Sequence, residues 1–179
     1  MEEIIKLPYS EQVVAEELNR LLKKHGYSIY IPASRQQKGV DLIIHKNGTK
    51  KIARIQVKAS RSYKDTSYKN FLLFGNFEGK YKKGDVDFYI LFGLYSQYNP
   101  GAKVNSKKCY KHVFLCFAET EMSQFLAKIK TKKGTKDIFF GFGFNSEKEI
   151  LLKRPDLGTN YSNFLLKDRI ETLKSFFEK

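Results

Sequence analysis

The alternation of apolar and polar positions predicts an amphipathic helix followed by a series of strands. Apolar residues early in the chain recur at the spacing of one helical face: Val14, Leu18, Leu21 and Leu22. Ser10 is a suitable N-cap and Gly26 a suitable residue to follow the last turn. The pattern therefore predicts a helix of about 15 residues that begins near Ser10.

Short apolar runs between turn residues predict the strands. They cover residues 27–31, 40–45, 51–59, 70–77, 86–95, 112–117, 138–144 and 150–152. Helical spacing returns after Thr120, a candidate cap, and again in a closing helix over residues 162–177. This order predicts an α/β (α+β) fold with a central mixed sheet flanked by helices. At 179 residues, the chain is expected to form a single domain over residues 1–179.

A hairpin is predicted at Asn47-Gly48, because this dipeptide between two β-type runs favours a tight turn. A two-residue turn pairs Lys46 with Thr49 and places Asp41 opposite Arg54. Side chains alternate between the faces of a strand. One face then holds Asp41, Ile43, His45, Ile52, Arg54, Gln56 and Lys58. The other is wholly apolar, with Val40, Leu42, Ile44, Ala53, Ile55 and Val57.

The polar residues of this hairpin have a structural interpretation as well as a functional one. Asp41 could form an ion pair with Arg54 across the strands, and Gln56 and Lys58 could be a solvated strand face. On the helix, Glu11 falls inside the buried stripe, whereas Glu16 faces away from it. The alternative for Glu11 is an exposed position in the first turn, favoured by the helix dipole.

The charge of the chain indicates a polyanionic partner. Lys and Arg total 33 against 19 Asp and Glu, a formal net charge of +14. Residues 46–69 alone contain eight basic residues and one acid. This distribution favours nucleic acid first and an anionic membrane surface second.

Several other classes of protein are not supported by the sequence. The two cysteines and three histidines form no CxxC or HExxH pattern, so no zinc site or disulfide framework is expected. The N-terminus lacks a signal-peptide core, and the longest apolar run, residues 88–95, is too short to span a bilayer. We expect a cytoplasmic protein with no membrane partner and no small-molecule cofactor.

The order of the polar residues resembles the PD-(D/E)xK nuclease superfamily. That pattern is a Glu on the first helix, an Asp on the second strand and acid-x-Lys on the third; here it is matched by Glu11, Asp41 and Gln56-Val57-Lys58. The glutamine resembles the Gln-x-Lys variants, such as Mrr-type restriction enzymes and a group I intron homing endonuclease. The segment from Gly26 to Asp41 also resembles archaeal Holliday-junction resolvases. The similarity covers about residues 10–62, which would form the helix-plus-hairpin catalytic core, with residues 63–179 as the rest of the sheet, basic loops and the C-terminal helix.

The resemblance implies a restriction-endonuclease-like core and a metal-dependent DNA endonuclease. Its catalytic residues would be Glu11, Asp41, Gln56 and Lys58. Its Mg²⁺, for which Mn²⁺ can substitute, would be held by Asp41, Gln56, Glu11 and the backbone carbonyl of Val57. The partner would be double-stranded or branched DNA, cut by a homodimer. Loops on both sides of the site would contact this DNA through Arg35, Gln36, Lys38, Ser60, Arg61, Tyr63 and Lys64.

Three departures from the family pattern leave alternatives open. Val40 replaces the proline before the aspartate, Gln56 replaces an acid, and Glu11 lies about one turn earlier than in resolvase-like relatives, where Ala15 stands instead. Glu16 is therefore a second candidate for the helical carboxylate. A catalytically inactive nucleic-acid binder on the same fold, or an unrelated basic α/β protein, also fits the sequence. Restriction, homing, repair and junction resolution are not separated.

Overall fold

The computed structural model describes residues 2–32, 39–63, 65–75, 84–96, 110–129, 139–154 and 156–178, with side chains from Tyr9 onward except at residues 96, 154, 156 and 157. Three α-helices are described: α1 (Glu2–Leu22), α2 (Glu119–Lys128) and α3 (Ile170–Phe176). The 3₁₀ turns are η1 (Lys23–His25), η3 (Ser162–Phe164) and η4 (Leu166–Asp168). The strands are β1 (Tyr27–Tyr30), β2 (Leu42–Lys46), β3 (Ile52–Tyr63), β4 (Asn70–Phe74), β5 (Phe88–Ser96), β6 (Tyr110–Ala118), β7 (Phe140–Ser146), β8 (Glu149–Arg154) and β9 (Asp156–Asn160).

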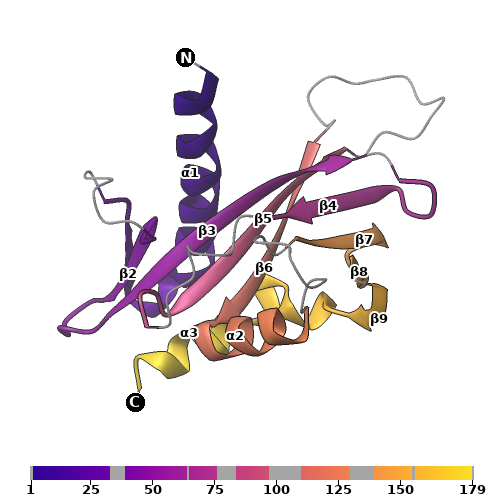
Figure 1. Cartoon of the computed structure of the whole chain (residues 1–179). Coiled ribbons are helices and arrows are strands. Elements are labelled where there is room, and N and C mark those ends of the chain that lie inside the picture. Colours follow the sequence, from indigo (N-terminus) through magenta and orange to yellow (C-terminus); the bar gives the residue numbers. More distant parts are fainter. Residues whose placement is uncertain are drawn as a thin grey trace.

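The 12-residue strand β3 organises the whole sheet and runs diagonally across it in Figure 1. Its first residues pair with β2, its middle pairs in parallel with β5, and its last two residues pair with β4. From β4 the order continues antiparallel through β7, β8 and β9, while β5 continues to β6. The α+β fold with a mixed sheet and flanking helices is therefore as predicted.

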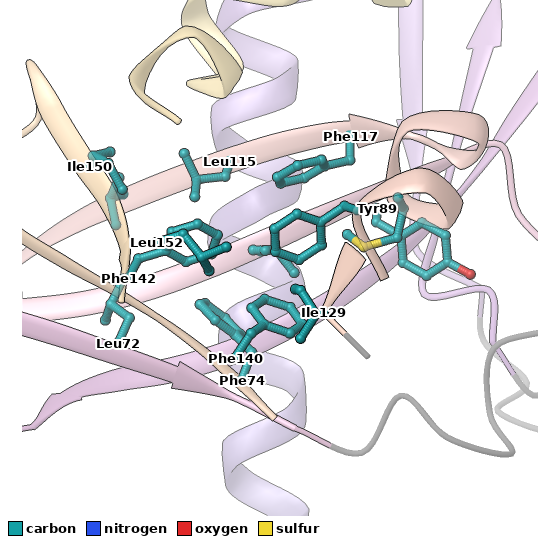
Figure 2. Close-up of a cluster of buried hydrophobic side chains, with 14 of the residues drawn as sticks. Leu72, Phe74, Tyr89, Leu115, Phe117, Ile129, Phe140, Phe142, Ile150 and Leu152 are labelled. Carbon is teal, nitrogen blue, oxygen red and sulfur yellow. The ribbon is translucent and has the colours of Figure 1, made fainter. Parts of the chain in front are cut away.

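Two apolar layers cover the two faces of this sheet. On one face, the α1 stripe of Val14, Leu18 and Leu22 packs with α3 against β2, β3 and β5. On the other face, an aromatic cluster joins β5 and β6 to α2 and to the β4–β7–β8 part of the sheet (Figure 2). Phe140, Phe142 and Phe144, at alternate positions of β7, all point into this cluster and are buried. The two layers together explain why β5 and β6 are apolar on both faces.

The first helix begins earlier than the sequence predicted. α1 starts at Glu2, and Ser10 lies within it with a buried side chain, so Ser10 is not its N-cap. A serine favours an N-cap but is also compatible with a helix interior, which makes the signal ambiguous. The predicted end is confirmed: Gly26 follows η1 in the left-handed region, with φ of 76°.

The C-terminal part differs more from the prediction. The expected closing helix is instead two 3₁₀ turns followed by the short α3, because Leu165 between the turns is extended and bridges Leu115 of β6. The predicted apolar side is nevertheless correct, since Leu166, Leu173 and Phe177 are all buried. Strand β9 was not predicted. Thr120, the predicted cap, lies inside α2, whose N-cap is Ala118. The Ala118 N–H donates to the Glu121 carboxylate at 2.8 Å.

Cys116 is a buried core residue, as its apolar surroundings predicted, and burial raises the pKa of its thiol to about 12. None of the described helices is long and apolar enough to cross a membrane.

Gly93 of β5 leaves room for the Leu72 side chain of β4 to pack directly against β5. A Cβ at this position would lie 2.3 Å from Leu72 Cδ1 and 2.8 Å from Val113 Cγ1, both in the core. Gly93→Ala is therefore expected to lower the free energy of unfolding by about 1–3 kcal/mol, measured by urea denaturation. Because Leu72 is the main obstacle, Gly93→Ala with Leu72→Ala should cost less than the sum of the single changes. Full additivity would contradict the close stacking.

Candidate metal-binding and nuclease site

The hairpin between β2 and β3 has the predicted faces but a different register. Ile43 pairs with Arg54 and His45 with Ile52, so each β2 residue lies opposite a β3 residue two positions later than predicted. The reason is a longer turn: the Lys46 amide bonds the Lys51 carbonyl, and Thr49 Oγ1 bonds the Lys46 carbonyl at 2.8 Å. A shift by two residues preserves the alternation of side chains. Leu42, Ile44, Ala53 and Ile55 accordingly form a fully buried apolar face.

Asp41 forms hydrogen bonds with the two β3 residues that flank Gln56. Its backbone amide donates to the Ile55 carbonyl at 2.8 Å, and its carboxylate Oδ2 accepts the Val57 N–H at 2.7 Å. β2 begins only at the next residue, so this carboxylate occupies the place on the β3 edge that a strand partner would otherwise fill. Asp41 is thus held beside Gln56, and not opposite Arg54.

Arg54, which the sequence allowed as an alternative ion-pair partner of Asp41, pairs with a different carboxylate. Arg54 binds Asp87, with Nε 3.1 Å from Oδ2, while Asp87 Oδ2 also accepts the Arg54 N–H at 2.7 Å. This bond between the ends of two neighbouring strands raises the pKa of Arg54. Asp87 was not singled out in the sequence, because the parallel pairing of β3 with β5 is a long-range contact that no local pattern indicates.

Gln56 and Lys58 lie on one face of β3, as predicted. They pair with Tyr89 and Leu91 of β5, whose side chains point into the aromatic cluster and away from α1. Gln56 is one of four buried polar residues among those described, with 8% of its surface exposed, and Lys58 is half-buried. The Gln56 amide lies next to the loop before Asp41, since a Cβ at Gly39 would be 3.9 Å from its Nε2.

Glu11 is buried on the sheet-facing side of α1. Only 7% of it is exposed, whereas Glu16 is exposed and Glu17 forms an ion pair with Arg20 at 2.7 Å. The helical phase predicted from the sequence is therefore correct. The alternative of an exposed first-turn glutamate is wrong, because α1 begins nine residues before Glu11.

The position of Glu11 along the strands follows from its neighbour Tyr9. The Tyr9 ring contacts Phe92, at 6.4 Å between centroids, and Phe92 pairs with Ala59 of β3. α1 also packs directly against β3. This turn of the helix is therefore level with the part of β3 that carries Lys58, but it lies over the opposite face of the strand from the Lys58 side chain.

The predicted DNA contacts are only partly described. Arg35, Gln36, Lys38 and Lys64 lie outside the described residues. The segment from Ser60 to Tyr63, expected to leave the strand, instead continues β3, because β4 pairs with its end. Arg61 and Tyr63 are exposed, with the guanidinium 5.6 Å from the ring centroid. The Ser60 hydroxyl accepts the Leu73 N–H at 3.0 Å and donates to the Arg61 carbonyl, so it holds β4 in place.

Two surface hollows lie away from these residues, between α1 and β6. Their volumes are about 410 and 490 Å³, and both are lined by Glu17, His112 and Phe114. His112 lies 3.3 Å from the Tyr9 hydroxyl, and burial lowers the pKa of its imidazole. Glu16, the second candidate for the helical carboxylate, lines the larger hollow, whereas Glu11, Asp41, Gln56 and Lys58 line neither. Within the described part of the chain, no three His, Cys, Asp or Glu side chains gather as a metal site; the predicted ligand set contains only two carboxylates.

Comparison with known proteins supports the architecture. No family model and no curated protein matches the sequence. Among solved structures, the chain is similar to a bacterial homing endonuclease, I-Ssp6803I, with a TM-score of 0.53 and 14% sequence identity. The match covers 97% of this chain and 95% of the homing endonuclease. The chain therefore shares the α+β fold of this homing endonuclease.

Proposed function

We propose that the protein is a metal-dependent DNA endonuclease that hydrolyses phosphodiester bonds. The observation that carries the proposal is the pair of hydrogen bonds between Asp41 and the peptide groups on both sides of Gln56. Lys58 follows two residues after Gln56 and points to the same face of β3. The match to a homing endonuclease over nearly the whole chain adds support, as does the net charge of +14.

The donor atoms of these residues fit a hard divalent cation. Mg²⁺ prefers oxygen ligands and usually keeps several waters. Asp41 and the side-chain carbonyl of Gln56 offer such oxygens, and the Val57 carbonyl is a further candidate. Glu11 lies on the α1 side of the sheet and would reach the cation over the sheet edge. When bound, the metal would polarise the scissile phosphate and lower the pKa of a bound water. A cation would also offset part of the cost of burying the Glu11 carboxylate.

The chain's own residues would prepare the site in distinct ways. The Val57 N–H fixes the orientation of the Asp41 carboxylate, which therefore does not have to be ordered when the substrate arrives. Gln56 contributes an oxygen without a negative charge, so cation binding would rest on Asp41 and Glu11. The Lys58 ammonium would lie against the phosphoryl oxygens, stabilising their charge and orienting the attacking water.

The proposed substrate is double-stranded or branched DNA. Arg61 and Tyr63 at the end of β3, and Arg35, Gln36, Lys38 and Lys64 in the segments that flank the site, would contact its phosphates. Two copies of the chain would be needed to cut both strands, so we propose a homodimer.

A second candidate function is DNA binding without cleavage. It is favoured by one observation: Gln56 stands where most of the superfamily has an acid, which leaves two carboxylates instead of three. Such a protein would use the same basic surface and would need no metal.

Nicking of supercoiled plasmid separates the two candidates. The unmodified protein is expected to nick plasmid with Mg²⁺ or Mn²⁺ and to be inactive with EDTA. Lys58→Ala should reduce the rate by about 100-fold or more, while a change at Lys24, an exposed lysine of η1, to alanine should leave it unchanged. DNA binding without nicking under either metal would overturn the endonuclease and favour the inactive binder.

A further inference from the structure

Strand β6 lies at an edge of the sheet, and its outer side is covered at one point only. In the described part of the chain it pairs with β5 alone, apart from a single antiparallel bridge between Leu115 and Leu165. After Leu165 the chain turns away into η4. No described strand therefore covers the outer side of residues 110–114, which we call the open edge. An open edge of this kind is a template for pairing with another strand.

The two hollows between α1 and β6 follow the open edge. One of them, of about 410 Å³, is lined by all five residues of the open edge together with Leu165 and Glu17. The other, of about 490 Å³, lies on the α1 side, where the Tyr9 ring contacts the His112 ring at 6.4 Å between centroids. The hollows thus leave room beside β6 where an added strand would lie.

Aromatic side chains of the open edge face α1. Val113 belongs to the aromatic cluster on the other face, whereas Phe114 packs on the α1 side, so Tyr110 and His112 also face α1. The His112 ring accordingly lies 5.4 Å from that of Phe92, which is in the α1 layer. Tyr110 is 69% exposed, more than any other large apolar side chain described. Exposed aromatic rings are enriched where one protein contacts another.

The charges around the two hollows balance one another. Their lining residues include three acids and three basic residues: Glu16, Glu17, Glu147, Arg20, Lys111 and Lys167. The adjacent Lys148, Glu149 and Asp168 add a single negative charge. The whole chain carries +14, so copies of it repel each other over most of their surface. The groove beside the open edge is free of this repulsion and does not attract a polyanion, which favours a second copy as its occupant.

We propose that the chain forms a homodimer in which the open edge of β6 pairs antiparallel with that of a second copy, about a two-fold axis at His112. An axis at Lys111 would place two lysines directly opposite each other, which is destabilising. An axis at Val113 would require the place beside Leu115 that Leu165 occupies. An axis at His112 uses only residues 110–114 and brings Tyr110 opposite the second copy's Phe114, an aromatic pair on the α1 side. Such an interface is self-complementary, as a two-fold axis demands.

This inference rests on the proposed function only for the number of copies, because no residue of the candidate catalytic site takes part in the pairing. β5 separates β6 from β3, so the joined edges leave the hairpin of β2 and β3 uncovered. A two-fold axis perpendicular to the sheet also keeps the Lys58 side chains of both copies on the same side of the joined sheet.

A disulfide across the axis tests the pairing. Facing residues of antiparallel strands have Cα atoms about 4.5–5.5 Å apart, within the range that a disulfide spans. In a Cys109→Ser background, His112→Cys should give a covalent dimer under mild oxidation, seen by non-reducing electrophoresis; Cys116 is buried and stays reduced. Tyr30→Cys is the matched control, because Tyr30 is 51% exposed on β1, the edge strand beyond β2. It should give no such dimer.

A mixture of two variants tests the same register without changing His112. Tyr110→Cys and Phe114→Cys, both in the Cys109→Ser background, should form a covalent dimer when mixed. Neither should do so alone, because each cysteine would lie four residues from its own copy, roughly 14 Å at about 3.4 Å per residue. This pair decides the matter if His112→Cys, which loses the contact with Tyr9, fails to fold.

The outcomes separate this inference from the endonuclease. Sedimentation of the unmodified protein without DNA or metal should give the mass of a dimer, and a monomer overturns the inference even if the protein nicks plasmid. A dimer in which neither His112→Cys nor the mixture links faster than Tyr30→Cys overturns the open edge as its interface. A dimer linked at His112 that does not nick DNA supports the inference and overturns the endonuclease.

Discussion

Asp41→Asn is expected to reduce plasmid cleavage on the order of 1,000-fold while leaving the fold and DNA binding intact. Its carboxylate is the proposed principal metal ligand, and loss of several kcal/mol of charge stabilisation corresponds to a rate loss of this size. The asparagine oxygen can still accept the Val57 N–H, which Asp41 now accepts at 2.7 Å. Cleavage rates over a Mg²⁺ titration, with anisotropy for binding, measure the effect.

Asp41→Ala provides the matched comparison. It removes both the charge and the acceptor for the Val57 N–H, so it should lower the free energy of unfolding by about 1 kcal/mol more than Asp41→Asn. Both variants should cleave equally slowly. If Asp41→Asn cleaves at the parental rate while Asp41→Ala does not, the aspartate has a structural role only, and the proposed metal site would be wrong.

Glu11→Gln is expected to reduce cleavage by about 100-fold and to raise the Mg²⁺ concentration needed for half-maximal rate. With an amide already at Gln56, Glu11 would supply the second of only two negative charges for the cation, so its loss weakens cation binding markedly. Glu16→Gln is the matched control on the same helix, because Glu16 is exposed and faces away from the sheet.

The outcome for Glu16→Gln decides which glutamate belongs to the site. The Glu16→Gln protein should cleave within about twofold of the parental rate, because salt screens the charge of an exposed side chain that faces away from the sheet. A large loss in Glu16→Gln with none in Glu11→Gln would reverse the assignment. Thermal unfolding of both variants separates these outcomes from a stability effect of the buried position of Glu11.

The local parts of the site could be predicted because they depend on periodicity. The two-residue period of β2 and β3 placed Gln56 and Lys58 on one face, and the helical period placed Glu11 in the buried stripe with Glu16 outside it. The predicted length of the turn between β2 and β3 was wrong, but the predicted faces of the two strands were correct. A shift of two residues keeps every side chain on its face, whereas a shift of one would have reversed them.

The sequence by itself determined the fold class, the buried faces of α1 and of the hairpin, and the residues on which the nuclease hypothesis depends. Only the tertiary structure decided that β3 pairs with both β2 and β5, that Arg54 binds Asp87, and that the Asp41 carboxylate accepts the Val57 N–H. It also decided that Gly141 and Gly143 lie beneath aromatic rings. The physical reason is range: propensity and periodicity act between neighbours in the chain, whereas strand partners and ion pairs join residues brought together only by the folded sheet.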